Sequence, residues 1–174
     1  MSVLVEYIAL FKHLINEVGD LEGLNAFPFK KISSDKYSFT TPNNETIEVR
    51  FTPVLSNIIK PELPEFKVIN VGFTVNGNDS QHSKNEGGYL LVILKTVFDI
   101  TMEYIQNNNP SHLFISGTNK DIDNSIISWD KQKTELYQLI VIKNLHKLPG
   151  NWKYEIIYNA LGIEGKSLLI SKIK

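Results

Sequence analysis

The chain of 174 residues contains no cysteine. That absence excludes disulfides, zinc sites built from thiolates and cysteine nucleophiles, and it is the composition expected in a reducing compartment. The four histidines are His13, His82, His112 and His146. None of them stands with another histidine or an acid in a metal-binding spacing such as HExxH. We therefore expect no metal site.

The chain also has no strong excess of positive or negative charge and no long apolar run. The formal net charge is −1 and the longest basic run is Lys30–Lys31, so binding of nucleic acid through a broadly basic surface is not indicated. The longest apolar run, Tyr89–Leu94, is far shorter than the roughly 20 residues that cross a bilayer. The N-terminus lacks the pattern of a secretion signal. These absences favour a soluble, cytoplasmic protein with no membrane partner.

The composition supports one folded domain over residues 1–174. Hydrophobic residues make up 42% and charged residues 21% of the chain, which are ordinary values for a globular protein. The length is enough for one well-packed core, whereas two cores would be cramped.

The first half of the chain reads as a helix followed by antiparallel strands. Apolar residues at helical spacing predict a helix over residues 1–18, and Gly19 ends it. Residues 19–34 are expected to form a loop whose Phe27-Pro28-Phe29 cluster packs against the core. Alternating apolar residues then predict antiparallel strands within residues 36–76.

These strands are expected at Tyr37–Thr41, Ile47–Phe51 and Phe66–Val75. The first two form a hairpin, and the proline-rich connector Val54–Glu65 separates them from the third. Gly72 within the third strand indicates a bulge or a close approach of another backbone segment.

The second half of the chain predicts a helix-strand-helix unit over residues 87–147 and a C-terminal hairpin over residues 152–173. The expected elements are a long helix at Gly87–Asn108, a buried strand at Leu113–Ser116, a helix at Asp130–Lys147 and strands at Trp152–Tyr158 and Ser167–Ile173. The predicted fold class is therefore α/β, in the α+β sense. We expect a mixed, mostly antiparallel central sheet of about six strands flanked by three helices.

Two consecutive glycines at the start of the long helix are the most informative local feature. The segment Lys84–Tyr89 reads KNEGGY, and it joins a polar loop to the helix through Gly87 and Gly88. Free backbone N–H groups and the positive end of the helix dipole can hold a phosphate or carboxylate there, with Lys84 adding a positive charge. Alternatively, the glycines only let the loop turn sharply into the helix.

The predicted order of elements resembles the GNAT N-acetyltransferase fold over nearly the whole chain. In that family a basic-or-Gln-x-x-Gly-x-Gly/Ala motif wraps the pyrophosphate of acetyl-CoA. Lys84, Gly87 and Gly88 stand at that place, but Tyr89 replaces the final small residue. The family also places a strand bulge beside the pantetheine arm, where Gly72 would correspond.

A later helix of that family often carries a Leu-Tyr pair, whose tyrosine protonates the departing thiolate. Leu136-Tyr137 matches this pair by type, which makes Tyr137 the candidate catalytic residue under an enzymatic interpretation. The Gly-Phe that usually follows is missing, and Val141 stands where the glycine would be. The alternative for Tyr137 is a core aromatic residue.

Several segments are also similar to uncharacterised small proteins encoded in tailed-phage genomes. These segments are 15–20, 37–41, 87–105, 112–117 and 134–145. No activity follows from this resemblance, but it favours a phage-encoded protein that acts in the host cytoplasm or in the virion.

Together, these features favour a non-catalytic binding or assembly module on a GNAT-like scaffold, without a cofactor and with a protein as its partner. Its working surface would lie between the third and fourth strands, where the resemblance implies that the chains diverge. The alternative is an acetyl-CoA-dependent N-acetyltransferase. A third hypothesis is a regulator that grips a host protein through the polar loop Asn76–Glu86.

Overall fold

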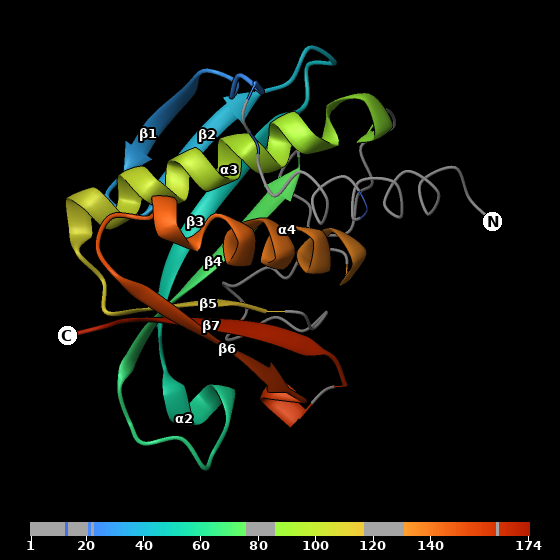
Figure 1. The fold of residues 1–174 in the computed structure, drawn as a ribbon. Coiled ribbons are helices and arrows are strands. Elements are labelled where there is room, and N and C mark those ends of the chain that lie inside the picture. Colours follow the sequence, from blue (N-terminus) through green and yellow to red (C-terminus); the bar gives the residue numbers. More distant parts are fainter. Residues whose placement is uncertain (1–12, 14–20, 22, 76–85, 117–130, 163) are drawn as a thin grey trace.

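The computed structural model describes residues 13, 21, 23–75, 86–116, 131–162 and 164–174 (Figure 1). The strands are β1 (Phe29–Ser33), β2 (Lys36–Thr40), β3 (Thr46–Leu55), β4 (Lys67–Val75), β5 (His112–Ile115), β6 (Trp152–Tyr158) and β7 (Lys166–Lys172). The helices are α2 (Ser56–Ile59), α3 (Glu86–Asn108) and α4 (Lys131–Lys143), with short 3₁₀ turns η1 (Leu145–Lys147) and η2 (Ala160–Gly162). The predicted helix over residues 1–18 lies outside the described residues, apart from His13, which is helical and exposed.

The strands form one mixed sheet in the order β1-β2-β3-β4-β5-β7-β6. All neighbouring strands are antiparallel except β4 and β5, which run parallel. The predicted class, a mixed and mostly antiparallel sheet with helices, is confirmed. The predicted count of about six strands is wrong, because the sheet has seven.

The strand that the sequence did not reveal is β1, which we expected to be part of a loop. It is an edge strand that pairs with β2, and only its first residue, Phe29, packs against the core. The remaining four residues are exposed, so the segment shows no apolar alternation. The expected packing of Phe27 and Phe29 against the core is confirmed.

Strand β3 continues four residues beyond Phe51, where we expected the connector to begin soon after. Proline is tolerated at position 53 because the pairing of β2 with β3 stops at Arg50, so that among the described strands β3 pairs there with β4 alone. The connector after β3 is held by Ser56. Its hydroxyl donates to the Pro64 carbonyl (2.5 Å) and accepts from the Phe66 N–H (2.9 Å).

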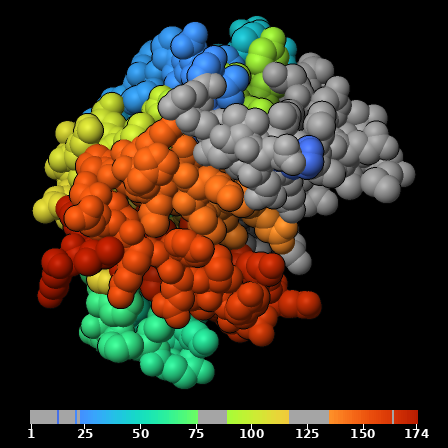
Figure 2. All heavy atoms as spheres, in the orientation of Figure 1, coloured from blue at the N-terminus to red at the C-terminus, as the bar shows by residue number. Residues whose placement is uncertain are grey.

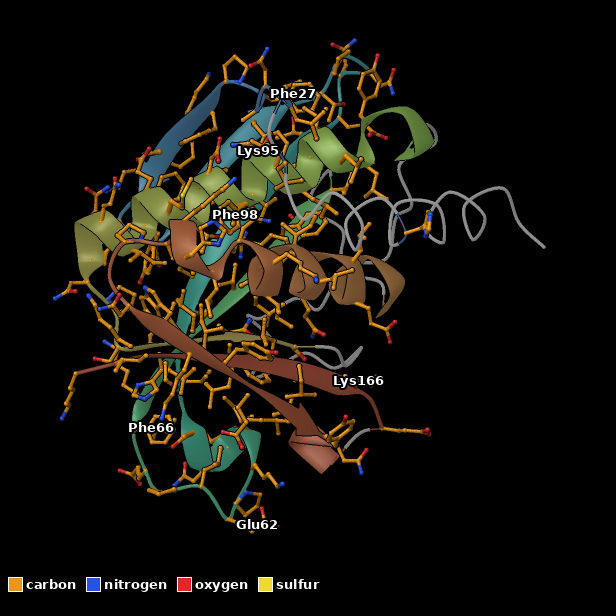
Figure 3. All side chains as sticks on the ribbon, in the orientation of Figure 1. Phe27, Glu62, Phe66, Lys95, Phe98 and Lys166 are labelled. Atoms are coloured by element: carbon orange, nitrogen blue, oxygen red, sulfur yellow. The ribbon has the colours of Figure 1, made fainter. Side chains whose placement is uncertain are left out.

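Helices α3 and α4 cover one face of the sheet (Figure 1). The main core lies between them and the strands, and Figure 3 shows Phe98 reaching into the space between the two helices. Within this core the rings of Phe51 and Tyr104 stack with centroids 3.8 Å apart. The same view in space-filling form shows α4, β6 and β7 forming much of this side of the molecule (Figure 2).

The opposite face of the sheet carries a smaller apolar cluster beneath α2 and η2. Its buried members are Ile59, Val68, Phe114, Ile157, Ala160 and Leu169. Phe66 packs at its edge on the α2 side (Figure 3). Within the described ranges, no helix is both long enough and apolar enough to cross a membrane.

Helix α4 ends earlier than predicted. Its last helical residue is Lys143, and the chain then tightens into η1. The change occurs at Asn144, whose side-chain amide nitrogen donates to the Ile140 carbonyl (2.9 Å), so a side chain competes for the backbone acceptor at the end of the helix. The predicted first residue of this helix, Asp130, lies outside the described residues.

Candidate functional site

The candidate site begins where β4 and β5 separate. The two parallel strands share only the pairs Ile69↔Leu113 and Asn70↔Phe114. Beyond Asn70, β4 continues to Val75 beside β3, while β5, which pairs with β7 along its whole length, runs at an angle to β4 and ends at Ile115 (Figure 1). The last five residues of β4 therefore pair on one side only, among the strands that the structure describes.

Helix α3 begins at Glu86, so Gly87 and Gly88 form part of its first turn. Lys84 lies outside the described residues, as do His82 and residues 76–85 of the loop proposed to grip a partner. Of the three residues proposed to bind an anion, the structure therefore describes only Gly87 and Gly88. The start of a helix alone does not define a binding site.

Strand β4 contains no bulge at Gly72. Its register with β3 is continuous from Leu55↔Lys67 to Ile47↔Val75, and Arg50 lies directly opposite Gly72. The expectation of a bulge is therefore wrong, and the alternative of a close approach stays open. An uninterrupted ladder keeps the backbone groups of β4 on that side paired with β3 and does not turn them toward a ligand.

Tyr137 extends from α4 into the core and contacts α3. Its side chain is fully buried, and its hydroxyl lies 2.9 Å from Thr101 Oγ1. Because Thr101 donates its only hydroxyl proton to the Val97 carbonyl (2.8 Å), Tyr137 is the donor in this pair. Burial raises the pKa of Tyr137 well above its usual value, and Thr101 opposes this shift only in part.

The geometry keeps Tyr137 apart from the glycine pair. Thr101 follows Gly87 by 14 residues on α3, which corresponds to roughly 21 Å along the helix axis. Only an extended ligand could reach both places. In the described conformation the Tyr137 hydroxyl is enclosed by the core, which fits the interpretation of a core aromatic residue.

A strip of mostly polar residues on the other face of β3 and β4 was not singled out by the sequence. This polar strip consists of Arg50, Asn70, Gly72 and Thr74, and it faces away from α3 and α4. Asn70 and Thr74 are 1% and 2% exposed. Asn70 Oδ1, Thr74 Oγ1 and Arg50 Nε are buried without a hydrogen-bond partner in the part of the chain that the structure describes.

Charge is unevenly distributed beside the polar strip. Glu48 lies opposite Thr74 and forms an ion pair with Lys36, and its second oxygen is 3.9 Å from Arg50 Nη2. Among the described side chains, one carboxylate thus faces two cations, which leaves a positive excess at this place. The side chain of Arg50 is 42% exposed although its Nε is buried, so its outer guanidinium nitrogens remain accessible.

A signal for the polar strip was present in the sequence. Strand β4 reads KVINVGFTV, with apolar residues at alternate positions and Asn70, Gly72 and Thr74 between them. This alternation is typical of a strand with one wet face, so it does not reveal that the polar positions are buried. Their burial became visible only with the fold.

Comparisons of the chain with family models, curated proteins and solved structures found no match. Among the described residues, no group of three acidic or histidine side chains is arranged to hold a metal ion. The features of the described structure that bear on function are therefore the polar strip, the separation of β4 from β5, and the position of Tyr137.

Proposed function

We propose that this protein is a non-catalytic binding module on a GNAT-like scaffold, and that the polar strip beside the separation of β4 and β5 is its binding surface. The observation that carries the proposal is the burial of three polar atoms without partners on adjacent positions of β3 and β4. A buried donor or acceptor without a partner costs about 1–3 kcal/mol. A fold that retains three of them together is best explained by a partner that completes their hydrogen bonds.

An extended peptide segment of another protein is the partner that best fits this surface. From Val71 to Val75, β4 pairs with β3 and with no other strand among the described residues, so an added strand would pair with its second edge. These residues are buried in the described conformation, so the peptide has to part the chain around them to reach that edge. A peptide in this position also brings backbone N–H and C=O groups close to Asn70 and Thr74. The positive excess at Arg50 favours an acidic side chain on the peptide.

Two features favour binding without catalysis. The hydroxyl of Tyr137 donates within the core and is not exposed to a substrate, and β4 lacks the bulge that the acetyltransferase resemblance implies. We also propose, from the resemblance of its segments to phage proteins, that the protein is phage-encoded and acts in the host cytoplasm or the virion.

The binding proposal is tested by comparing variants in pull-downs from host lysate. Asn70→Leu and Thr74→Val remove the unpaired oxygens with little change in volume, and Thr52→Val, opposite Asn70 on the same face, is the matched control. We expect a partner captured by the wild type and by Thr52→Val to be lost from the Asn70→Leu/Thr74→Val double variant. A partner set that is identical for all three proteins would contradict the proposal.

The alternative function, an acetyl-CoA-dependent N-acetyltransferase, is favoured by the short parallel pairing of β4 and β5 ahead of the α3 glycines. In that case Lys84, Gly87 and Gly88 would hold the pyrophosphate, and Tyr137 would protonate the thiolate after the core around it had opened. Binding at a ligand concentration 100-fold above Kd adds about 2.7 kcal/mol to stability. A melting temperature that does not change in millimolar acetyl-CoA would exclude this alternative.

A further inference from the structure

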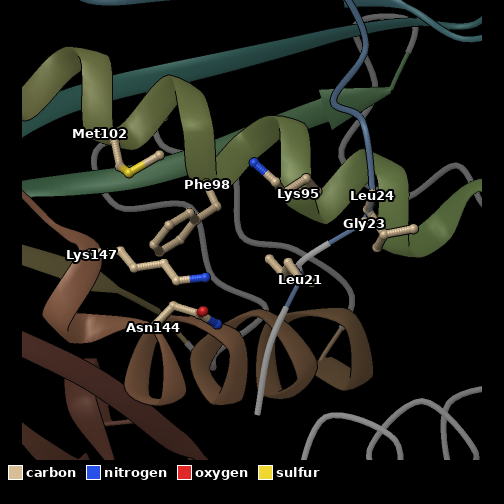
Figure 4. Close-up of a pocket in the computed structure, with 8 residues that line it drawn as sticks. All are labelled: Leu21, Gly23, Leu24, Lys95, Phe98, Met102, Asn144 and Lys147. Carbon is tan, nitrogen blue, oxygen red and sulfur yellow. The ribbon is translucent and has the colours of Figure 1, made fainter. Parts of the chain in front are cut away.

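Strand β6 forms one edge of the sheet and pairs only with β7 among the described strands (Figure 1). The polar strip is on β3 and β4, and two strands lie between β4 and β6 in the sheet. A pocket of about 210 Å³ lies between α3, the end of α4 and the segment around residues 21–24 (Figure 4), and none of its lining residues belongs to β6. The outer edge of β6 is therefore separate from both.

The two edges of the sheet differ in their protection against pairing with another chain. Edge strand β1 carries Lys30 and Lys31, and its register with β2 shifts between Lys31 and Ser33. Lysines and an irregular register are among the features that keep an edge strand from adding a further strand. Strand β6 contains no proline and no register shift, and its pairing with β7 is continuous over all seven residues. Its outer edge is thus regular enough to accept another strand.

Hydrogen bonds at the two ends of β6 show which of its backbone groups point outward. The Ile173 N–H donates to the Asn151 carbonyl (2.8 Å), and the Asn159 N–H donates to the Gly165 carbonyl (3.0 Å). Both bonds continue the register of β6 with β7. Because inward and outward groups alternate along an antiparallel strand, the odd-numbered residues of β6 bond to β7 and the even-numbered ones point outward. The outward residues are Trp152, Tyr154, Ile156 and Tyr158.

The exposed side chains in the middle of β6 form a pattern that complements itself. Tyr154 is 50% exposed, and its neighbours Lys153 and Glu155 are exposed on the other face of the sheet. A half turn about Tyr154 exchanges the places of Lys153 and Glu155. An antiparallel copy in this position sets each Lys153 opposite Glu155 of the partner subunit. Opposite charges in such directly opposed positions stabilise an antiparallel pair of strands.

We propose that the outer edge of β6 pairs with β6 of a second copy of this chain, antiparallel and with Tyr154 on the two-fold axis. The outward backbone groups of Tyr154 then bond to Tyr154 of the partner subunit, and those of Trp152 bond to Ile156 of the partner subunit. The two tyrosine rings lie side by side and cover each other's apolar surface. Two seven-stranded sheets become one continuous sheet.

The charges select this register over its neighbours. Outward backbone groups have to face outward groups, so the two-fold axis passes through a single residue of β6. An axis at Lys153 or at Glu155 would set that residue opposite the same charge, which destabilises the pair. An axis at Ile156 would leave both charges without an opposite partner. Only an axis at Tyr154 satisfies the backbone and both charged side chains.

The proposal is tested by sedimentation of the full chain and of charge variants over a range of concentrations. Lys153→Glu and Glu155→Lys each create like-charge pairs at two symmetry-related positions, so each should weaken dimerisation about tenfold or more. The double variant Lys153→Glu/Glu155→Lys has the net charge of the wild type and should restore the dimer. Lys30→Glu, the same charge change at an exposed position of the edge strand β1, is the matched control and should leave dimerisation unchanged.

Disulfide crosslinking reports the register, because the chain has no cysteine of its own. Tyr154→Cys places two thiols on directly opposed residues whose Cα atoms are about 5.5 Å apart, a separation that a disulfide spans. Mild oxidation should therefore give a covalent dimer. Tyr158→Cys, 58% exposed on the same face of β6, is the matched control. Its two copies lie about 26 Å apart along the strands in the proposed register, so it should not crosslink.

A chain that stays monomeric at close to millimolar concentration would overturn the proposal. A double charge variant that associates no better than the single variants would also overturn it, as would equal crosslinking from positions 154 and 158. None of these variants changes the polar strip, and the pull-down variants Asn70→Leu and Thr74→Val do not change β6. Failure of the dimer would therefore leave the proposed peptide-binding function intact, and the converse also holds.

Discussion

The same substitution at two buried threonines should change stability in opposite directions. Thr74 and Thr101 are both 2% exposed. The Thr101 hydroxyl donates to the Val97 carbonyl and accepts from Tyr137, whereas Thr74 Oγ1 is buried without a described partner. Valine has nearly the shape of threonine but cannot form hydrogen bonds, so each substitution isolates the contribution of one hydroxyl.

The magnitudes follow from the cost of a buried, unpaired polar group. Thr74→Val removes such a group and should raise the free energy of unfolding by about 1–3 kcal/mol. For a chain of this size that corresponds to a rise in Tm of roughly 2–12 °C. Thr101→Val removes the two hydrogen bonds of a buried hydroxyl, so it should lower stability by a similar amount.

Urea titrations followed by circular dichroism measure both changes, with the denaturant dependence m checked for constancy. Thr52→Val, at a partly exposed position on β3, should stay within about 0.5 kcal/mol of the wild type. If Thr74→Val destabilises the protein as much as Thr101→Val does, Thr74 has a hydrogen-bond partner and the argument for the polar strip is refuted.

Three further outcomes are expected. The ring of His112 packs against Phe66 with centroids 4.3 Å apart, and burial together with the charge of Lys153 lowers the pKa of His112. The unfolded chain therefore takes up a proton at a higher pH than the folded protein, so stability should fall as the pH drops below about 6.5. In His112→Phe this acid-side loss should shrink, as measured by urea unfolding at pH 5 and pH 7, and an unchanged difference would contradict the pKa direction. Because burial raises the pKa of Tyr137, the tyrosine ionises first in the unfolded chain, and stability should fall as the pH rises above about 10. Tyr137→Phe should reduce this alkaline loss of stability. An equally steep loss in the wild type and in Tyr137→Phe would contradict the pKa direction. Gly150 has φ +96°, and a Cβ at this position would lie 2.8 Å from Lys172 Cε, so Gly150→Ala should lower Tm. Gly23→Ala is the reference, because Gly23 has a similar φ of +86° but no atom near its added Cβ. The two variants should lose similar amounts of Tm if the Lys172 side chain moves aside, and Gly150→Ala should lose more if it does not.

The elements that could be predicted from the sequence are those whose pattern is local. Helix α3 and strands β6 and β7 were located within a residue or so, because their apolar spacing is regular and their ends carry breaking residues. The inward position of Tyr137 was also predicted, and its burial confirms it. The sequence likewise indicated that β4 lies beside a separation from its neighbour, through the family resemblance.

The features that could not be predicted depend on tertiary neighbours. Strand β1 is defined by pairing with β2, since its own residues are mostly exposed. The continuation of β3 through Pro53 depends on where β2 stops. The burial of Asn70 and Thr74 depends on what covers the second face of the sheet, and the burial of Asn144 depends on segments that lie far apart in the sequence.

The most direct measurement of the central claim is photo-crosslinking from the polar strip in a cell lysate. A photo-reactive amino acid at position 50 replaces Arg50, whose outer part is accessible, and the control carries it at position 32 on the exposed edge strand β1. The account predicts a protein crosslinked from position 50 and not from position 32, with the attachment mapping to an extended segment of that protein. No crosslink from position 50, or the same products from both positions, would contradict it.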